Sequence, residues 1–349
     1  MQRLNFCTQA IQSLRKHMQG SPDFPQVLKI CQLLALSEKF VLPENGELVH
    51  SWGQMPNDLP AGRLPYPLTA IETRWTQDSA DMMDSLQSEH QSKLSKISVN
   101  VSTRRISLAF EVGAEFIDEI TDDHEVLKQA SSALKYAGAE RVQEPVGRIT
   151  MSIYYLDAAK RWEIVSAGLF QSYDPNLIGL KSGSSAYEDD IVAMLKKHGV
   201  EVKKGRKGIP YAPVMLLPKS YQLNYGIRGN TALQGVHHDV ANEANWIQDL
   251  VTALSCQNVK TERDEPSAFL LKERKKAKKP PLFSFHYLTV SGSQVGAERG
   301  GGIGQGHASP RTHLRRGHIR RLSDERTTWV NEAIINPGNG FADKVYNAR

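Results

Sequence analysis

The chain has 349 residues, of which 40% are hydrophobic and 23% charged, with a formal net charge of +5. This composition is ordinary for a globular protein, and the length predicts two or more domains. Its three cysteines, Cys7, Cys31 and Cys256, lie far apart without a CxxC pair. This excludes a disulfide framework, a zinc ribbon and a dithiol redox motif, and favours a reducing compartment.

The first 60 residues predict a small helical region. Apolar residues recur at helical spacing over 4–18 and, less regularly, over 26–40, with Gly20 and Pro22 between them. Residues 43–67 are rich in proline and predict an irregular connection. The N-terminus lacks the basic segment and apolar core of a signal peptide, and no apolar run approaches the about 20 residues of a membrane span. We therefore expect a soluble protein of the cytoplasm.

Residues 61–230 predict an α+β core. β-branched and aromatic residues with partial alternation predict strands at 68–75, 106–116, 149–156 and 162–170. In the second of these, Ile106, Leu108, Phe110 and Val112 fall on one face, as in a half-buried strand. Helices are predicted at 126–136 and 187–198, and an exposed helix or loop at 77–96.

Residues 231–349 predict a long helix followed by a basic hairpin module. The helix spans about 232–256, with an apolar stripe through Val240, Ala244 and Ile247. A lysine-rich run over 272–279, a strand over 282–290 and a glycine-rich linker over 291–308 follow. The whole chain thus predicts an α+β fold with a helical N-terminal region, a mixed or antiparallel central sheet with helices, and a basic C-terminal β-hairpin.

Positive charge is concentrated at one end of the chain. Residues 271–349 hold 15 Lys and Arg against 6 Asp and Glu, a balance of +9, whereas the other residues hold 28 against 32, a balance of −4. Such asymmetry indicates a polyanionic or acidic partner for the C-terminal part. It does not distinguish nucleic acid from an acidic protein.

Residues 310–335 contain six arginines and two histidines around Trp329. Residues 312–322 and 327–335 predict a hairpin whose loop is 323–326. If residues 312–322 form one strand, Arg316, His318 and Arg320 lie side by side on one face, about 7 Å apart. Gly317 in their midst argues against a helix.

Several segments of the chain resemble a family of uncharacterised phage and prophage proteins. They are residues 64–68, 253–259, 275–289 and 309–322, the last of which contains the run HLRRGHIRRL. Tails of that family carry a similar pattern, then a Trp-Val strand and a closing aromatic residue like Tyr346. The family has no assigned activity, so the resemblance implies no catalytic residue. It implies a phage protein that acts in the cytoplasm of a bacterial host.

Three hypotheses compete for the arginine–histidine cluster. In the first, arginine forks hold phosphates while Trp329 stacks on a base, with help from the basic run. The binding residues would be Arg311, Arg315, Arg316, Arg320, Arg321, Trp329, Lys275, Lys276, Lys278 and Lys279. In the second, His318 or His313 is a general acid or base and Arg316 stabilises a pentacovalent phosphate, which would make a metal-independent nuclease. In the third, the arginines pair with core carboxylates and only brace the hairpin.

Two other motifs are candidates for a metal site and a phosphate-binding loop. His237 and His238 are adjacent on a helix and point in different directions, so we expect no metal there. The glycines of 300–306 lack the spacing of a phosphate loop. We therefore expect no metal and no cofactor.

The sequence favours binding over catalysis. We expect the C-terminal module to bind nucleic acid or a host nucleoprotein, in a counter-defence or host-takeover role. The alternatives are the nuclease and a protein-only inhibitor of a host factor.

Overall fold

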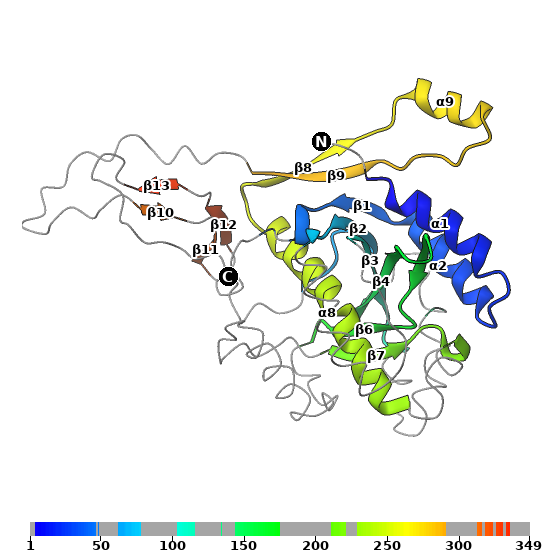
Figure 1. Cartoon of the computed structure of the whole chain (residues 1–349). Coiled ribbons are helices and arrows are strands. Elements are labelled where there is room, and N and C mark those ends of the chain that lie inside the picture. The colour runs from blue at the N-terminus through cyan, green and yellow to red at the C-terminus, as the bar shows by residue number, and fades with distance from the viewer. Residues whose placement is uncertain are drawn as a thin grey trace, which may run out of the picture.

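The computed structural model of the protein describes residues 4–46, 48, 62–77, 103–115, 134, 144–174, 211–220, 229–290, 313–315, 318–323, 326–330 and 333–335. Helices α1 (Phe6–His17) and α2 (Phe24–Leu36) cover one face of a mixed sheet. Helix α8 (Gly229–Leu254) covers the other face (Figure 1). The predicted α+β fold class is confirmed.

The strands of the sheet are β1 (Glu38–Val41), β2 (Leu68–Arg74), β3 (Arg104–Val112), β4 (Gly147–Leu156), β5 (Arg161–Ile164), β6 (Ala167–Ser172), β7 (Tyr211–Met215), β8 (Val259–Asp264) and β9 (Phe285–Val290). Their order is β7-β6-β4-β3-β2-β1-β9-β8, with β5 paired to β4. Strand β1 is parallel to β2 and β9, and the other pairings are antiparallel. Strands from residues 1–60, 61–230 and 231–349 thus meet in one sheet, while the three-part domain division stays a prediction.

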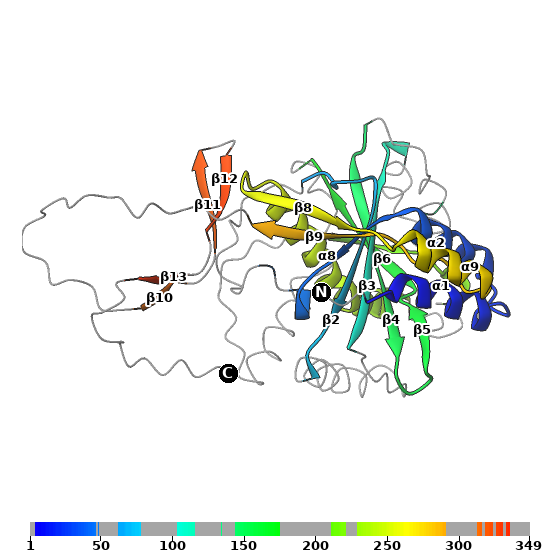
Figure 2. The ribbon, with the colours of Figure 1, turned by 90° about the horizontal axis from the view of Figure 1, so that it is seen from above.

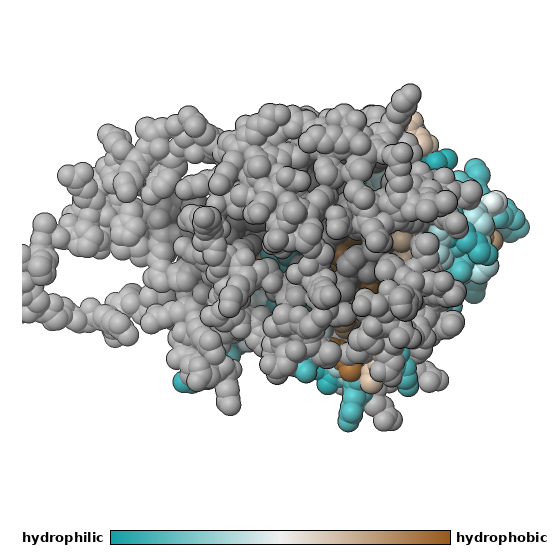
Figure 3. All heavy atoms as spheres, turned by 90° about the horizontal axis from the view of Figure 1, so that it is seen from below, coloured by the Kyte–Doolittle hydropathy of each residue, from teal (hydrophilic) through white to brown (hydrophobic). Residues whose placement is uncertain are grey.

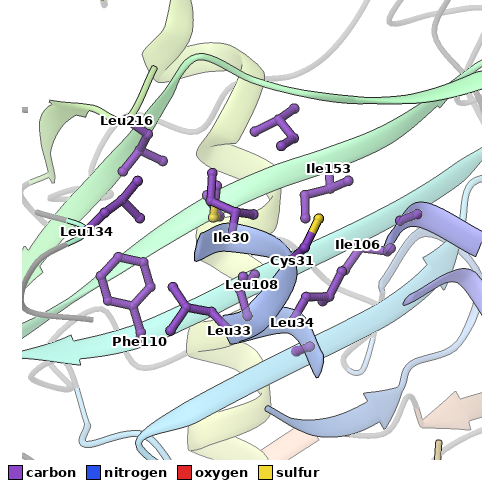
Figure 4. Close-up of a cluster of buried hydrophobic side chains, with 14 of the residues drawn as sticks. Ile30, Cys31, Leu33, Leu34, Ile106, Leu108, Phe110, Leu134, Ile153 and Leu216 are labelled. Carbon is purple, nitrogen blue, oxygen red and sulfur yellow. The ribbon is translucent and has the colours of Figure 1, made fainter. Parts of the chain in front are cut away.

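The larger apolar core lies between the sheet and the two N-terminal helices. Figure 4 shows Ile30, Leu33 and Leu34 of α2 beside Leu108 and Phe110 of β3, and all five are essentially inaccessible to solvent. Burying a side chain of this size contributes roughly 1.5–3 kcal/mol. This face of β3 is the apolar face that its alternation predicts.

The second face of the sheet packs against α8. Phe40 of β1 and Ile71 of β2 meet Trp246, Ile247 and Leu250 of the helix. Strand β3 is therefore buried on both faces, and the prediction of a half-buried strand is wrong because α8 covers its polar side.

One turn is shaped by this packing. Gly46 has φ +68, and a Cβ atom there would overlap the indole ring of Trp246. Glycine alone fits both the left-handed backbone and the close approach of α8.

The predicted N-terminal and long helices agree with α1 and α8 to within a few residues. The prediction of a helix over 26–40 is wrong beyond Leu36. Ser37 adopts an extended backbone (φ −63, ψ 149), and residues 38–41 form β1. The prediction relied on the spacing of apolar residues alone. Residues 38–41 instead form a strand because they pair with β2 and β9, and this tertiary pairing outweighs local helix propensity.

The predicted strand 162–170 is two strands. Strand β5 pairs with the C-terminal half of β4, and β6 pairs with its N-terminal half. Between them, the carbonyl of Ser166 accepts the N–H groups of Leu216 and Leu217, each at 2.9 Å. At the same break, the N–H of Val165 still donates to the carbonyl of Ser152 in β4 at 3.1 Å.

Strands β7 and β8 and helix α9 (Ala268–Lys276) were also not predicted. The predicted strand 282–290 is confirmed as β9, which begins at Phe285. The predicted helices at 126–136 and 187–198, the segment 77–96 and the linker 291–308 lie outside the described residues, apart from Gln77 and Leu134.

Strands β8 and β9 form the edge of the sheet and carry α9 beyond the body (Figure 1), and seen from above α9 overlaps α1 and α2 (Figure 2). Seen from below, the described hydrophilic side chains lie along the outer edge of the body and the apolar ones in its middle (Figure 3). Among the described helices, none has the length and apolarity that crossing a membrane requires.

Candidate nucleic-acid interface

The basic C-terminal segment forms paired strands. Strand β11 (His318–Ser323) is antiparallel to β12 (Arg326–Val330), and β10 (His313–Arg315) is antiparallel to β13 (Ala333–Ile335). The register agrees with the predicted hairpin, because Ser323 pairs with Arg326 at its turn. The predicted single strand 312–322 is described as two ladder segments, and residues 316–317 between them lie outside the described residues.

The register sets every arginine and histidine of these strands opposite an uncharged residue. The pairs are His313–Ile335, Arg315–Ala333, His318–Val330, Arg320–Thr328, Arg321–Thr327 and Arg326–Ser323. Directly opposed residues on antiparallel strands are the closest cross-strand neighbours. The described pairs therefore place no carboxylate opposite these cations across the ladder, and the hypothesis that core carboxylates pair with the arginines stays a prediction.

The structure brings some of the predicted site residues together and separates others. Arg320, Arg321 and Trp329 lie on one ladder, with Trp329 opposite Ile319. His313 and Arg315 lie on the other ladder, so the two proposed catalytic histidines belong to different strand pairs. Arg311 and Arg316 lie outside the described residues, and the nuclease geometry stays a prediction.

A hydrogen bond joins the hairpin to the body. The hydroxyl of Thr328 donates to the side-chain oxygen of Asn258 at 3.1 Å, and Asn258 lies in the turn between α8 and β8. Figures 1 and 2 both show β11 and β12 beside this end of β8. Because Thr328 is the partner of Arg320 in the ladder, the arginine is held next to the body by its cross-strand neighbour.

The four lysines of the predicted binding set lie elsewhere. Lys275 and Lys276 are in the last turn of α9, and Lys278 and Lys279 follow it, all of them exposed. Helix α9 follows the C-terminal end of β8, whereas the hairpin contacts the turn before β8. A six-residue strand spans about 20 Å, so the structure separates these lysines from the hairpin.

A buried polar network under α8 was missed. Arg105 of β3 donates to Glu243 of α8 at 3.1 Å, and the Ser152 hydroxyl donates to the same carboxylate at 2.8 Å. The Arg105 guanidinium also lies 4.3 Å from the ring centroid of Trp75. Burial raises the pKa of Glu243, although Arg105 and Ser152 act in the opposite direction. Glu243 interrupts the apolar stripe of α8 between Val240 and Ile247, and this was the signal available in the sequence.

A second network lies nearer the end of α8. The fully buried guanidinium of Arg148 donates to the carbonyl of Gly62 at 3.1 Å, to Gln248 of α8 at 2.6 Å and to Gln171 of β6. It ties α8 to the sheet and to the segment before β2. Both networks are sealed from solvent, which suits a structural role better than chemistry on a substrate.

A pocket of about 220 Å³ lies beside the second network. It is lined by Arg63, Leu64, Pro65, Tyr66, Pro67 and Glu111. Tyr173 donates to Glu111 at 3.2 Å, and burial raises the pKa of its phenol. The pocket does not include any of the predicted site residues.

Metal chemistry finds no support in the described part of the chain, where no three His, Cys, Asp or Glu side chains gather to hold an ion. The side chains of His237 and His238 lie outside that part.

No family model, no curated protein and no solved structure matches this chain.

Proposed function

We propose that the protein binds the phosphate backbone of nucleic acid, free or within a host nucleoprotein, through the hairpin β10–β13. The setting we propose is the cytoplasm of a phage-infected bacterium, where such binding would serve counter-defence or host takeover. Binding, rather than catalysis, is the function that the arrangement of the hairpin supports best.

One observation carries the proposal: each described Arg and His of the hairpin is opposed by an uncharged residue. The guanidinium group of arginine presents a planar fork of donors that suits a ligand oxyanion, and the described register sets no acid opposite these arginines. Thr327, opposite Arg321, adds a small hydroxyl side chain of the kind that contacts phosphate oxygens in nucleic-acid complexes. Trp329, on the same strand, supplies an aromatic ring on which a base stacks.

The experiment compares two double variants of the full chain. Arg320→Ala/Arg321→Ala removes two adjacent cations of β11, and Lys160→Ala/Arg161→Ala removes two adjacent exposed cations at the β4–β5 turn. Binding of labelled single-stranded and duplex oligonucleotides is measured by fluorescence anisotropy at several salt concentrations. We expect the hairpin variant to weaken binding and to reduce the log–log salt slope by about 1.4 for single strands, with little change in the control.

Two results would overturn the proposal. Equal affinities of the two variants would place the binding surface outside the hairpin. A wild-type protein that binds no oligonucleotide at physiological salt, but co-purifies with a stoichiometric host protein free of nucleic acid, would instead support the protein-only inhibitor.

A further inference from the structure

Helix α9 projects from the edge of the sheet and buries none of its residues. It is carried by β8 and β9, which pair with each other over six residues. The ring of Phe269, in the first turn of α9, is 74% exposed, and Leu270 beside it is 39% exposed. A large aromatic side chain with so much free surface is available to a ligand.

Both ends of this short helix are held by capping interactions. The Ser267 hydroxyl accepts the N–H of Leu270 at 3.2 Å at the N-terminus. At the C-terminus, the N–H of Lys278 donates to the carbonyl of Lys275 at 3.1 Å, and that of Lys279 donates to the carbonyl of Arg274 at 2.8 Å. This pair of bonds is a Schellman motif. The caps fix α9 without help from an apolar core.

The Schellman motif contains an unusual residue. Lys278 occupies its left-handed position with φ +50, where glycine is the usual residue because it has no Cβ atom. A lysine there is strained, and its ammonium group is exposed.

The charge of the same segment indicates its ligand. Residues 272–279 contain six cations and one acid: Lys272, Arg274, Lys275, Lys276, Lys278 and Lys279 with Glu273. The Glu273 carboxylate accepts a hydrogen bond from the Lys276 ammonium group at 2.8 Å, and the Arg274 guanidinium donates to the carbonyl of Pro280 at 2.8 Å. A dense row of exposed lysines attracts a polyanion, and an adjacent exposed ring provides a stacking surface for a base.

We propose that α9 and the turn after it form a second contact for single-stranded nucleic acid, in which the lysines neutralise phosphates and Phe269 stacks on a base. The contact is separate from the hairpin, because β8 lies between the two. The inference rests on the proposed function in that both take the phosphodiester backbone as ligand. It adds Phe269 as a contact residue, places Lys278 in a contact separate from the hairpin, and makes the protein bivalent for a strand long enough to reach both sites.

The chain offers a matched control for Lys278. Lys160, in the β4–β5 turn, is also an exposed lysine with a left-handed backbone (φ +53). Lys278→Gly and Lys160→Gly therefore remove the same charge and relieve the same kind of strain at two distant places. We expect neither variant to lower the melting temperature, so that a change in binding cannot be ascribed to unfolding.

The test uses the full chain with single-stranded DNA and RNA oligonucleotides of the same sequence, measured by fluorescence anisotropy. Lys278→Gly should reduce the log–log salt slope by about 0.7, and Phe269→Ala should weaken binding about tenfold. Lys160→Gly should bind as the wild type does. The two oligonucleotides decide which nucleic acid the arm prefers.

The outcomes separate this inference from the proposed function. If Phe269→Ala and Lys278→Gly bind like the wild type while Arg320→Ala/Arg321→Ala binds weakly, the arm contact is overturned and the hairpin function stands. If the arm variants alone weaken binding, the arm contact stands and the hairpin function fails. If the arm variants lose affinity only for a polyglutamate probe, the arm recognises an acidic protein surface and the inference is wrong.

Discussion

The carboxylate of Glu72, in strand β2, accepts the backbone N–H of Cys7 at 2.7 Å across 65 residues of sequence. Cys7 is the second residue of α1, so the sheet supplies an acceptor to the free N–H groups at the start of this helix. Burial raises the pKa of Glu72, and this outweighs the lowering by the N–H groups of Cys7 and Phe6 and by Lys39. The contact fixes α1 on the sheet at the cost of a buried acid.

This acid predicts a pH dependence of stability. A carboxyl with a raised pKa in the folded state binds its proton more tightly there than in the unfolded chain, so its contribution is fully present below the unfolded pKa, about 4.3, and is lost as pH rises through the raised value. We expect Glu72→Gln, which keeps an oxygen acceptor for Cys7, to reduce the fall in the free energy of unfolding over this window. Urea denaturation at a series of pH values measures the slope. If Glu72→Gln leaves the dependence of the free energy of unfolding on pH unchanged, titration of Glu72 is not its cause.

The ion pair between Arg105 and Glu243 predicts strong coupling. Both side chains are almost completely buried, at 5% and 1% exposure. We expect Arg105→Met to lower the free energy of unfolding by about 3–5 kcal/mol, because Glu243 would be left as a buried charge without its cation. Arg105→Met/Glu243→Leu should cost much less than the sum of the single changes. Urea unfolding of the four proteins measures the coupling, and additive effects would show that the two residues act independently.

The bond from Thr328 to Asn258 predicts a local effect. Thr328→Val keeps the shape of the side chain but removes the donor, with an expected loss of about 0.5–1.5 kcal/mol in docking of the hairpin on the body. Amide hydrogen exchange should therefore become faster in β11 and β12, while the thermal transition of the body changes little. Faster exchange throughout the sheet would mean that the hairpin is part of the main cooperative unit.

His318 distinguishes binding from catalysis. It lies on a different strand pair from His313, and a binding surface predicts that oligonucleotides stay intact and that His318→Ala changes affinity only slightly. Incubation of end-labelled RNA and DNA with the wild type and His318→Ala, followed by gel electrophoresis, tests this. Cleavage by the wild type that His318→Ala abolishes, with affinity retained, would make the hairpin a nuclease site.

Local patterns predicted the elements that follow one clear period. The alternation of Ile106, Leu108 and Phe110 identified β3, and the apolar stripe of Val240, Ala244 and Ile247 identified α8. The hairpin of β11 and β12 followed from two β-rich segments around a polar turn. Each of these patterns lies within a single short segment of the sequence, and the structure has the predicted element there.

The missed features depend on partners far away in the chain. Strand β1 exists because β2 and β9 pair with it, and its own four residues carry no strand period. Strand β8 is mostly exposed and charged, so it lacks the apolar alternation of a half-buried strand. The separation of the lysines of α9 from the hairpin follows from β8 lying between them, which the sequence alone did not show.

The most direct test of the central claim is the salt dependence of wild-type binding to a single-stranded oligonucleotide. Neutralisation of about four phosphates predicts that log K falls linearly with log salt with a slope near −3. Fluorescence anisotropy between about 50 and 200 mM salt should show an affinity loss of about 60-fold over this range. Absence of binding at the lowest salt, or an affinity that does not change with salt, would contradict a phosphate-binding surface on this protein.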